Sequence, residues 1–171
     1  MSLDIRTADE LMDRELEARW AERRLGPQAE VLRWLLRTFA DHGGPVLVSE
    51  VEAAFPEQSV MAVRDELANL DRADLIVMAG HEIPLVYPFS ATPTAFVVTL
   101  ANGQERFACC ATDALGIAAM LAARILIRSA CHHCGQPLEL MADATGPLGA
   151  DEIMVWVGKR GKGERRACTG L

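Results

Sequence analysis

Residues 95–123, AFVVTLANGQERFACCATDALGIAAMLAA, decide the fold that this sequence predicts. The β-branched run at 95–100 indicates one strand, and residues 104–109 indicate a second. The Asn-Gly pair between them is typical of a tight hairpin turn. A helix at 112–123 follows directly. The stretch therefore predicts a strand pair whose second strand leads straight into a helix.

The residues after this stretch predict more strands. Apolar and β-branched residues indicate strands at 124–130 and 138–142, separated by the turn CHHCGQP at 131–137. A last strand is expected at 153–157. The tail at 158–171 contains five bases and one acid, and the sequence does not decide whether it is ordered.

The residues before the stretch predict a helical half that ends in strands. Ser49 is the expected N-cap of a short helix, because Glu52 stands three residues later as a capping-box partner. Pro56 is expected to begin the next helix. The predicted elements are helices at 8–24, from about 28 to 40, from 49 to about 55 and from 56, then a strand at 74–79. This is the element order of a winged helix-turn-helix.

The helix that would contact DNA in such a module is acidic here. Residues 57–74 carry five acids against two bases, Arg64 and Arg72, whereas a DNA-reading helix needs Lys or Arg facing phosphate. We therefore interpret the winged helix as a structural or dimerising element. A homodimer stays open as a partner, and nucleic acid is not favoured.

Composition sets the broad class of protein. The chain has 171 residues, of which 50% are hydrophobic and 24% charged, and this excludes a disordered or collagen-like chain. No apolar run reaches the roughly 18 to 20 residues of a membrane span. The N-terminus carries acids where a secretory leader would carry bases, and the net charge is −7. The sequence predicts a soluble, cytoplasmic protein with no membrane partner.

Cys110 and Asp113 form the first candidate site, at the predicted junction of strand and helix. The helix N-terminus would stabilise a thiolate there and lower the pKa of Cys110. Asp113 projects to the same side of the first turn, and a neighbouring thiolate would raise the pKa of its carboxyl, which suits a proton donor. The alternative is a buried cysteine beside an aspartate that caps the helix. Spacing alone favours that alternative.

Cys131 and Cys134 form the second candidate, a Cys-x-x-Cys turn followed by glycine. Such a turn is one half of a zinc knuckle, but a complete site needs two further ligands. His132, His133 or Cys110 could supply them, although no spacing rule supports this. A redox pair and a hairpin with two incidental thiols are the other options.

Cys168 is the last of the five cysteines, an odd count that favours thiol or metal chemistry over a disulfide framework. It lies in the basic segment Arg165-Arg166-Ala167-Cys168, where guanidinium groups would favour its thiolate. The alternative is a spare cysteine in an unstructured tail.

The order of these segments resembles the alkylmercury lyase (organomercurial lyase) family. The resemblance covers roughly residues 30–157, and its most specific part is the motif Cys-Ala-x-Asp-Ala-Leu at 110–115, set after a hairpin. It implies an α+β fold, in which a winged-helix-like helical half precedes a small mixed or antiparallel sheet with one packed helix. The expected segments are an N-terminal helix at 1–27, a winged-helix-like domain at 28–88, an alkylmercury-lyase-like domain at 89–157 and a basic tail at 158–171.

The resemblance also implies a chemistry. In that family two thiolates and an aspartate cleave a carbon–mercury bond by protonolysis, which releases the hydrocarbon and leaves Hg(II) on the sulfurs. Mercury is a soft cation, and thiolates are soft ligands. Cys110 matches the first thiol and mercury ligand, and Asp113 matches the proton donor. The implied substrate is an organomercurial, no cofactor is required, Hg(II) is the bound product, and a mercuric reductase or a thiol acceptor would receive it.

The second thiol is where the sequence departs from the family. There it lies on a later strand that a further C-terminal segment follows, and Cys168 is the expected match in a chain with a shortened C-terminus. Cys109 is an alternative, although neighbouring side chains on a strand point to opposite faces. The match at Cys131 is expected to be structural, with Cys134 accompanying it.

Three hypotheses follow for the function. The first is an organomercurial lyase that uses Cys110, Asp113 and Cys168. The second is a non-catalytic thiol protein that binds zinc, copper or mercury through Cys131 and Cys134, with Cys110 as a further ligand. The third, which the acidic second helix disfavours, is a winged-helix regulator that senses metal through these thiols.

Overall fold

The computed structural model describes residues 5–7, 10, 14, 18, 21, 29–150 and 152–155. Most of the helix expected at 8–24 and all of the tail at 158–171, including Cys168, lie outside these residues.

The described residues form an α+β fold with four helices and nine strands. This confirms the predicted class. In chain order the elements are α3 (Ala29–His42), β1 (Val46–Leu47), α4 (Val48–Ala54), α5 (Val60–Arg72), β2 (Ile76–Ala79), β3 (Glu82–Val86), β4 (Phe89–Ser90), β5 (Val97–Thr99), β6 (Glu105–Ala108), α6 (Ala111–Leu121), β7 (Ile125–Ala130), β8 (Pro137–Asp143) and β9 (Gly146–Leu148).

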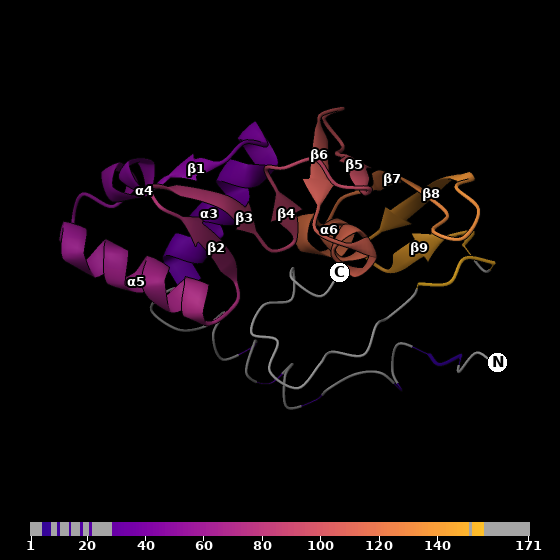
Figure 1. The fold of residues 1–171 in the computed structure, drawn as a ribbon, viewed down its shortest axis with the longest axis horizontal. Coiled ribbons are helices and arrows are strands. Elements are labelled where there is room, and N and C mark those ends of the chain that lie inside the picture. The colour runs from indigo at the N-terminus through magenta and orange to yellow at the C-terminus, as the bar shows by residue number, and fades with distance from the viewer. Residues whose placement is uncertain are drawn as a thin grey trace.

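All nine described strands belong to one sheet, and every pairing in it is antiparallel. The strand order is β1-β3-β4-β6-β5-β7-β8-β9, and β2 pairs with β3 outside this order. Figure 1 shows α3, α4 and α5 with β1–β3 at one end, and α6 with β5–β9 at the other. The short strand β4 joins the two halves, because it pairs with β3 on one side and with β6 on the other.

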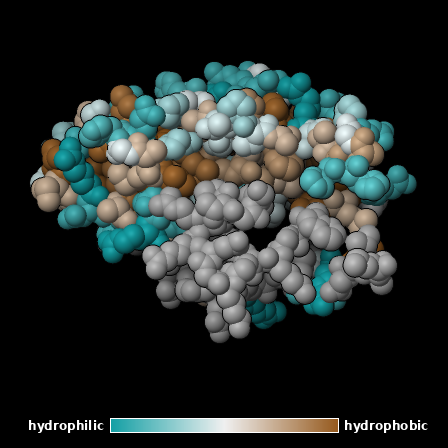
Figure 2. All heavy atoms as spheres, viewed as in Figure 1, coloured by the Kyte–Doolittle hydropathy of each residue, from teal (hydrophilic) through white to brown (hydrophobic). Residues whose placement is uncertain are grey.

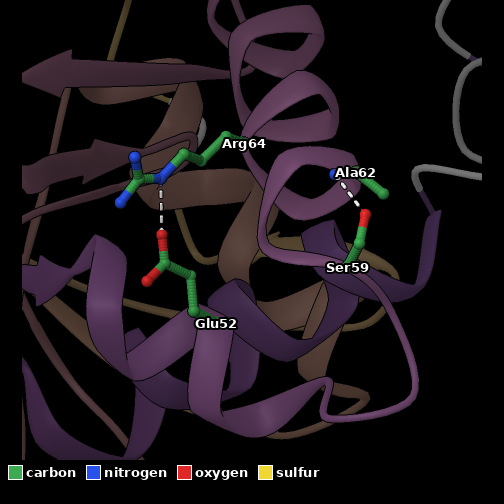
Figure 3. Close-up of polar contacts among 4 residues, drawn as sticks. All are labelled: Glu52, Ser59, Ala62 and Arg64. Atoms are coloured by element: carbon green, nitrogen blue, oxygen red, sulfur yellow. Dashed lines mark hydrogen bonds and ion pairs between the residues drawn. The ribbon is translucent and has the colours of Figure 1, made fainter.

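The helices at the N-terminal end follow their apolar periodicity. Helix α3 buries one face, and α5 buries Val63, Leu67 and Leu70 at spacings of four and three residues. Figure 3 shows how α4 and α5 are connected, by an ion pair of 2.6 Å between Glu52 Oε1 and Arg64 Nε. The guanidinium of Arg64 is therefore engaged by a carboxylate of the preceding helix.

Two helix starts differ from the prediction. Helix α4 begins one residue before Ser49, and the carboxylate of Glu50 accepts a hydrogen bond of 2.6 Å from the N–H of Leu47. Helix α5 begins at Val60 instead of Pro56, because the hydroxyl of Ser59 accepts from the N–H of Ala62 at 3.2 Å (Figure 3). The serine hydroxyl satisfies an N–H of the first turn, whereas Phe55, the N-cap of a helix that began at Pro56, has no side-chain acceptor.

The C-terminal half confirms the predicted hairpin and corrects the last strand. β5 and β6 pair as expected around Gly103, which has a φ of 82°. The strand expected at 153–157 was wrong, since 153–155 form no strand and the chain pairs β9 with β8 instead. A turn closed by Thr145, which donates to Asp143 through its N–H and hydroxyl at 2.8 and 2.6 Å, reverses the chain before β9.

Strand β4 lies at Phe89–Ser90, where the sequence predicts no strand. Two residues are too few to show a strand period, and β4 exists because Ser90 faces Leu85 of β3 and Phe107 of β6. Leu85 is near Ser90 in the sequence, but the pairing with Phe107 joins residues that are far apart.

One apolar core runs through both halves. It includes Leu35 and Phe39 of α3, Phe89 of β4, Ile117 of α6 and Ile125 of β7. On the face drawn in Figure 2, hydrophilic residues line the upper rim. More apolar residues lie below this rim, over the middle of the molecule. No helix in the described part of the chain is long and apolar enough to span a membrane.

Arg106 of β6 connects this core to the end of α3. This residue is only 8% exposed. Nε donates to the carbonyls of Phe39 and Ala40 at 3.0 and 2.9 Å, and one terminal nitrogen donates to the carbonyl of Asp41 at 2.6 Å. These are carbonyls of the last helical turn, which have no partner within a helix, so Arg106 caps α3 from the sheet. Gly43, with a φ of 70°, lies against the guanidinium, and a Cβ there would come within 2.9 Å of Arg106 Cδ.

We predict that Arg106→Ala destabilises the protein by about 2–4 kcal/mol, because three carbonyls lose a charged donor inside the fold. Arg106→Lys should recover only part of this, since an ammonium cannot reproduce the planar fork. Arg128→Ala is the matched control: this arginine pairs with Glu105, is 44% exposed, and should cost less than about 1 kcal/mol. Urea unfolding followed by circular dichroism measures all three. Equal losses for the Arg106 and Arg128 variants would contradict the capping role.

Candidate active site

The junction between β6 and α6 positions the first thiol. Strand β6 ends at Ala108, and the N–H of Cys109 still donates to the carbonyl of Pro88 at 3.0 Å. The next residue, Cys110, is the N-cap of α6 and has an extended backbone. The strand therefore fixes the direction in which the chain enters the helix, and the thiol of Cys110 stands at the helix start.

Cys110 and Asp113 are in direct contact, as the spacing predicted. The Cys110 thiol donates to Oδ2 of Asp113 across 3.0 Å, and the N–H of Asp113 donates back to the sulfur at 3.5 Å. Both residues are half-buried. The sulfur takes the place that a serine hydroxyl has in an ordinary N-cap, so helix geometry holds the thiol and the carboxyl together.

The pKa of Cys110 shifts opposite to the prediction. Burial raises it first, and the hydrogen bond to Asp113 and the charge of Asp113 raise it further. The N–H of Asp113 and the hydroxyl of Thr112 favour the thiolate and oppose this shift. The predicted lowering was wrong because desolvation and the carboxylate outweigh the helix start.

The pKa of Asp113 is raised, as predicted, but the cause is different. Burial raises it, whereas hydrogen bonds from the Cys110 thiol and from the Cys110 backbone N–H lower it. The cause expected from the sequence is a neighbouring negative charge. In the folded protein the carboxyl holds its proton more tightly because it has lost water.

Thr112 is a residue that the sequence argument missed. Its hydroxyl favours the thiolate of Cys110, although Thr112 itself is exposed. The sequence could have indicated this contact, because a hydroxyl residue stands two positions after the cysteine at the helix start, and Thr112 is the second residue of α6.

Cys131 and Cys134 lie in a separate turn between β7 and β8. The N–H of Cys131 donates to the carbonyl of Gln136 at 2.8 Å, and its own carbonyl accepts from the N–H of Gly135 at 2.8 Å. Cys131 is half-buried, and Cys134 is exposed. The N–H groups of Cys134 and His133, followed by the thiol of Cys134, lower the pKa of Cys131.

The Cys110–Asp113 pair and the Cys131–Cys134 pair do not form one metal site among the described residues. Val97 of β5 pairs with Phe107 of β6 and with Arg128 of β7, so Cys110 and Cys131 each lie three residues past the same row of the sheet. Beyond that row, β6 leads into α6, and β7 leads into the turn before β8. Within the described residues, no three His, Cys, Asp or Glu side chains gather as a metal site. A zinc site at Cys131 and Cys134 would therefore have two thiol ligands, and no third ligand lies beside them among the described residues.

The contacts of Cys110 predict that Asp113 and Thr112 have opposite effects on the pKa of its thiol. Asp113→Asn should lower the pKa of Cys110, because it removes the carboxylate that favours the protonated thiol. Thr112→Val should raise it, because it removes a hydroxyl that favours the thiolate. Alkylation by iodoacetamide across a pH series, resolved at Cys110 by mass spectrometry, measures both. Shifts in the same direction would contradict the contact geometry.

The raised pKa of Asp113 also predicts a pH dependence of stability. The folded state favours the protonated carboxyl, so its contribution is complete below the ordinary pKa of 3.8 and is lost as pH rises through the raised value. Asp113→Asn cannot ionise and should gain stability relative to the unsubstituted chain as pH rises. Asp143, whose pKa is lowered by Thr145, is the opposite control: Asp143→Asn should lose relative stability as pH rises from the lowered value to the ordinary pKa of 3.8 and should change little above it. Urea midpoints at several pH values test the pair, and parallel trends would refute the assignment.

Comparison with known proteins gives the family context of this site. The alkylmercury lyase (MerB) family model matches residues 89–170. Curated alkylmercury lyases of Bacillus cereus and Clostridium butyricum are each 29% identical over 117 residues, which are 67% of this chain and 52% of each relative. The chain therefore spans about half the length of the curated relatives it matches.

A solved structure gives the same likeness at the level of the fold. The mercury-bound form of MerB2 aligns with a TM-score of 0.61 at 24% identity, covering 71% of this chain and 58% of that one. The matched residues 89–170 include Cys110, Asp113, Cys131 and Cys168. The resemblance to the alkylmercury lyase family that the motif at 110–115 carries is thereby confirmed over residues 89–170.

Proposed function

We propose that this chain cleaves the carbon–mercury bond of an organomercurial, with Cys110 and Asp113 as its catalytic pair. The observation that carries the proposal is the 3.0 Å contact between the Cys110 thiol and the Asp113 carboxyl. It lies at a helix start inside the segment that matches the alkylmercury lyases.

The first step is the exchange of a proton for mercury. The organomercurial cation bonds to the sulfur of Cys110, and the S–H bond breaks, because a metal-bound thiol loses its proton. The proton passes to Oδ2 of Asp113, which already accepts from this thiol. Burial, which raises the pKa of Asp113, helps the carboxyl to hold that proton.

The second step is protonolysis. A second thiolate bonds to mercury and pushes electron density toward carbon, the carbon–mercury bond breaks, and its electron pair takes the proton of Asp113. The hydrocarbon leaves, Hg(II) remains on two sulfurs, and Asp113 is again a carboxylate. A general acid held at this distance contributes typically 10²- to 10⁴-fold to such a step.

We propose Cys168 as the second thiol. It lies outside the described residues, and its support is its place within the matched span, after Cys134 in the sequence. Cys109, directly before Cys110, is the alternative. Replacing each in turn separates them, because only the true second ligand should be needed for hydrocarbon release.

The helical half is proposed to be winged-helix-like, over residues 28–88, with the lyase-like domain at 89–157. Its support is the order α3-β1-α4-α5-β2-β3 and the pairing of both β1 and β2 with β3. A structural role is favoured over DNA binding, because Arg64 of α5 is engaged by Glu52.

The proposed setting is the cytoplasm, where cellular thiols keep cysteines reduced. Cys110, Cys131 and Cys134 are present as thiols. The Hg(II) product would pass to a thiol acceptor or a mercuric reductase.

A single-turnover assay with phenylmercury under excess thiol tests the proposal, with benzene measured by headspace gas chromatography. The unsubstituted chain should release benzene, and Cys110→Ala should release none. Asp113→Asn should still bind the mercurial but release benzene about 10²- to 10⁴-fold more slowly. Asp143→Asn, a matched carboxylate substitution on β8, should behave like the unsubstituted chain.

Retention of full activity by Cys110→Ala would refute the assignment of this thiol. Binding of phenylmercury without benzene release would favour the second hypothesis, a non-catalytic thiol protein that binds soft metals.

A further inference from the structure

The turn between β7 and β8 presents two thiols that the proposed lyase chemistry does not use. β7 and β8 form the longest pairing of the sheet, with six residue pairs from Ile125–Ala142 to Ala130–Pro137. The turn at 131–136 is thus held by a regular hairpin. A site on such a support is more precisely placed than one on a free loop.

Backbone hydrogen bonds close a tight turn that contains the two cysteines. The carbonyl of Cys131 accepts from the N–H of Gly135, four residues later, and the N–H of Cys131 donates to the carbonyl of Gln136, both at 2.8 Å. Residues three apart in one such turn project to the same side, which brings Cys134 back toward Cys131. Gly135, with a φ of 72°, then directs the chain into β8.

The two thiols differ in access. Cys131 is half-buried at the base of the turn, and Cys134 is exposed. The intervening His132 and His133 are also exposed. A cation can therefore reach the pair from solution without passing Cys110, which stands at the start of α6.

The donor set indicates the class of ligand. Two sulfurs on one turn offer soft ligands to a soft cation, and a chelate competes with separate monothiols through its high effective concentration. Zinc in structural sites takes four ligands, whereas a two-sulfur pair suits an ion that is satisfied by two thiolates.

We infer that the Cys131–Cys134 turn is a second thiol site, separate from Cys110 and Asp113, that binds one Hg(II) between its two sulfurs. The choice of Hg(II) rests on the proposed function, which would generate this ion in the same protein. The step is a ligand exchange without redox change: Hg(II) bound by two small monothiolates transfers to the turn, two Hg–S bonds break and two form, and the protons of Cys131 and Cys134 leave on the released monothiols.

The test uses a variant in which the turn holds the only cysteines. Replacing Cys109, Cys110 and Cys168 by Ser leaves two of the five cysteines of the chain. Mercuric chloride and a small excess of glutathione are added, the protein is desalted, and mercury is measured by mass spectrometry. We expect about one Hg(II) per chain, and about tenfold less when Cys134→Ser is added as the matched control. Equal retention by both variants, or retention by neither, would overturn the inference.

A second measurement covers the case in which the triple variant does not fold. In the chain with Cys110→Ala alone, one equivalent of mercuric chloride should protect Cys131 and Cys134 together from iodoacetamide. Protection of only one, or of neither, would overturn the site. Uptake of Zn(II) but not Hg(II) under the same competition would overturn the choice of ion.

These measurements use inorganic Hg(II), so they do not require a carbon–mercury bond to be cleaved. If phenylmercury yields no benzene while the turn retains Hg(II), the lyase proposal fails and the site is supported. If benzene is released while the turn retains no Hg(II), the lyase proposal stands and the second site is overturned.

Discussion

The contact between Arg106 and the end of α3 is the constraint on which the rest of the fold depends. A buried guanidinium is costly unless each of its donors finds an acceptor. Here the acceptors are carbonyls of α3 and of β6 itself, together with the Gln104 side chain. Because α3 belongs to the helical end and β6 to the end that matches the alkylmercury lyase family model, the requirement to satisfy Arg106 fixes how the two ends meet.

That constraint reaches the candidate site through β6. Arg106 and Cys110 are four residues apart, and the pairing of β4 with β6 at Phe89–Ala108 holds the strand just before the helix begins. Cys110 then caps α6 through its sulfur. The thiol is thus positioned by backbone pairing and by a helix start, both of which are rigid elements. The proposed reaction would need this precision, because it moves a proton between two atoms 3.0 Å apart.

Local patterns predicted α3, the β5–β6 hairpin and the Cys110–Asp113 contact, since each depends on residues within a few positions of one another. The sequence could not reveal β4, because β4 has only two residues and one of its two partners, β6, is distant in the sequence. It could not reveal the burial of Arg106 either, because a charged residue in a strand normally faces solvent. The lowered pKa that the sequence predicts for Cys110 was also wrong. The helix start is visible in the sequence, but the desolvation that opposes it depends on the packed fold. Local geometry was predictable, whereas burial was not.

Burial gives the Cys110–Asp113 pair its chemical character. Each group alone would be costly to ionise there, and burial raises the pKa of both. The hydrogen bond lets the thiol and the carboxyl share one proton. When one of the two groups becomes negatively charged, the other holds the proton and donates a hydrogen bond to it. A thiophilic cation that displaces the proton from sulfur finds an acceptor already in contact, and that acceptor holds the proton more tightly than an exposed carboxyl would. Desolvation makes Asp113 costly to fold as a carboxylate. In the proposed reaction the same desolvation would suit Asp113 to return a proton to the departing carbanion.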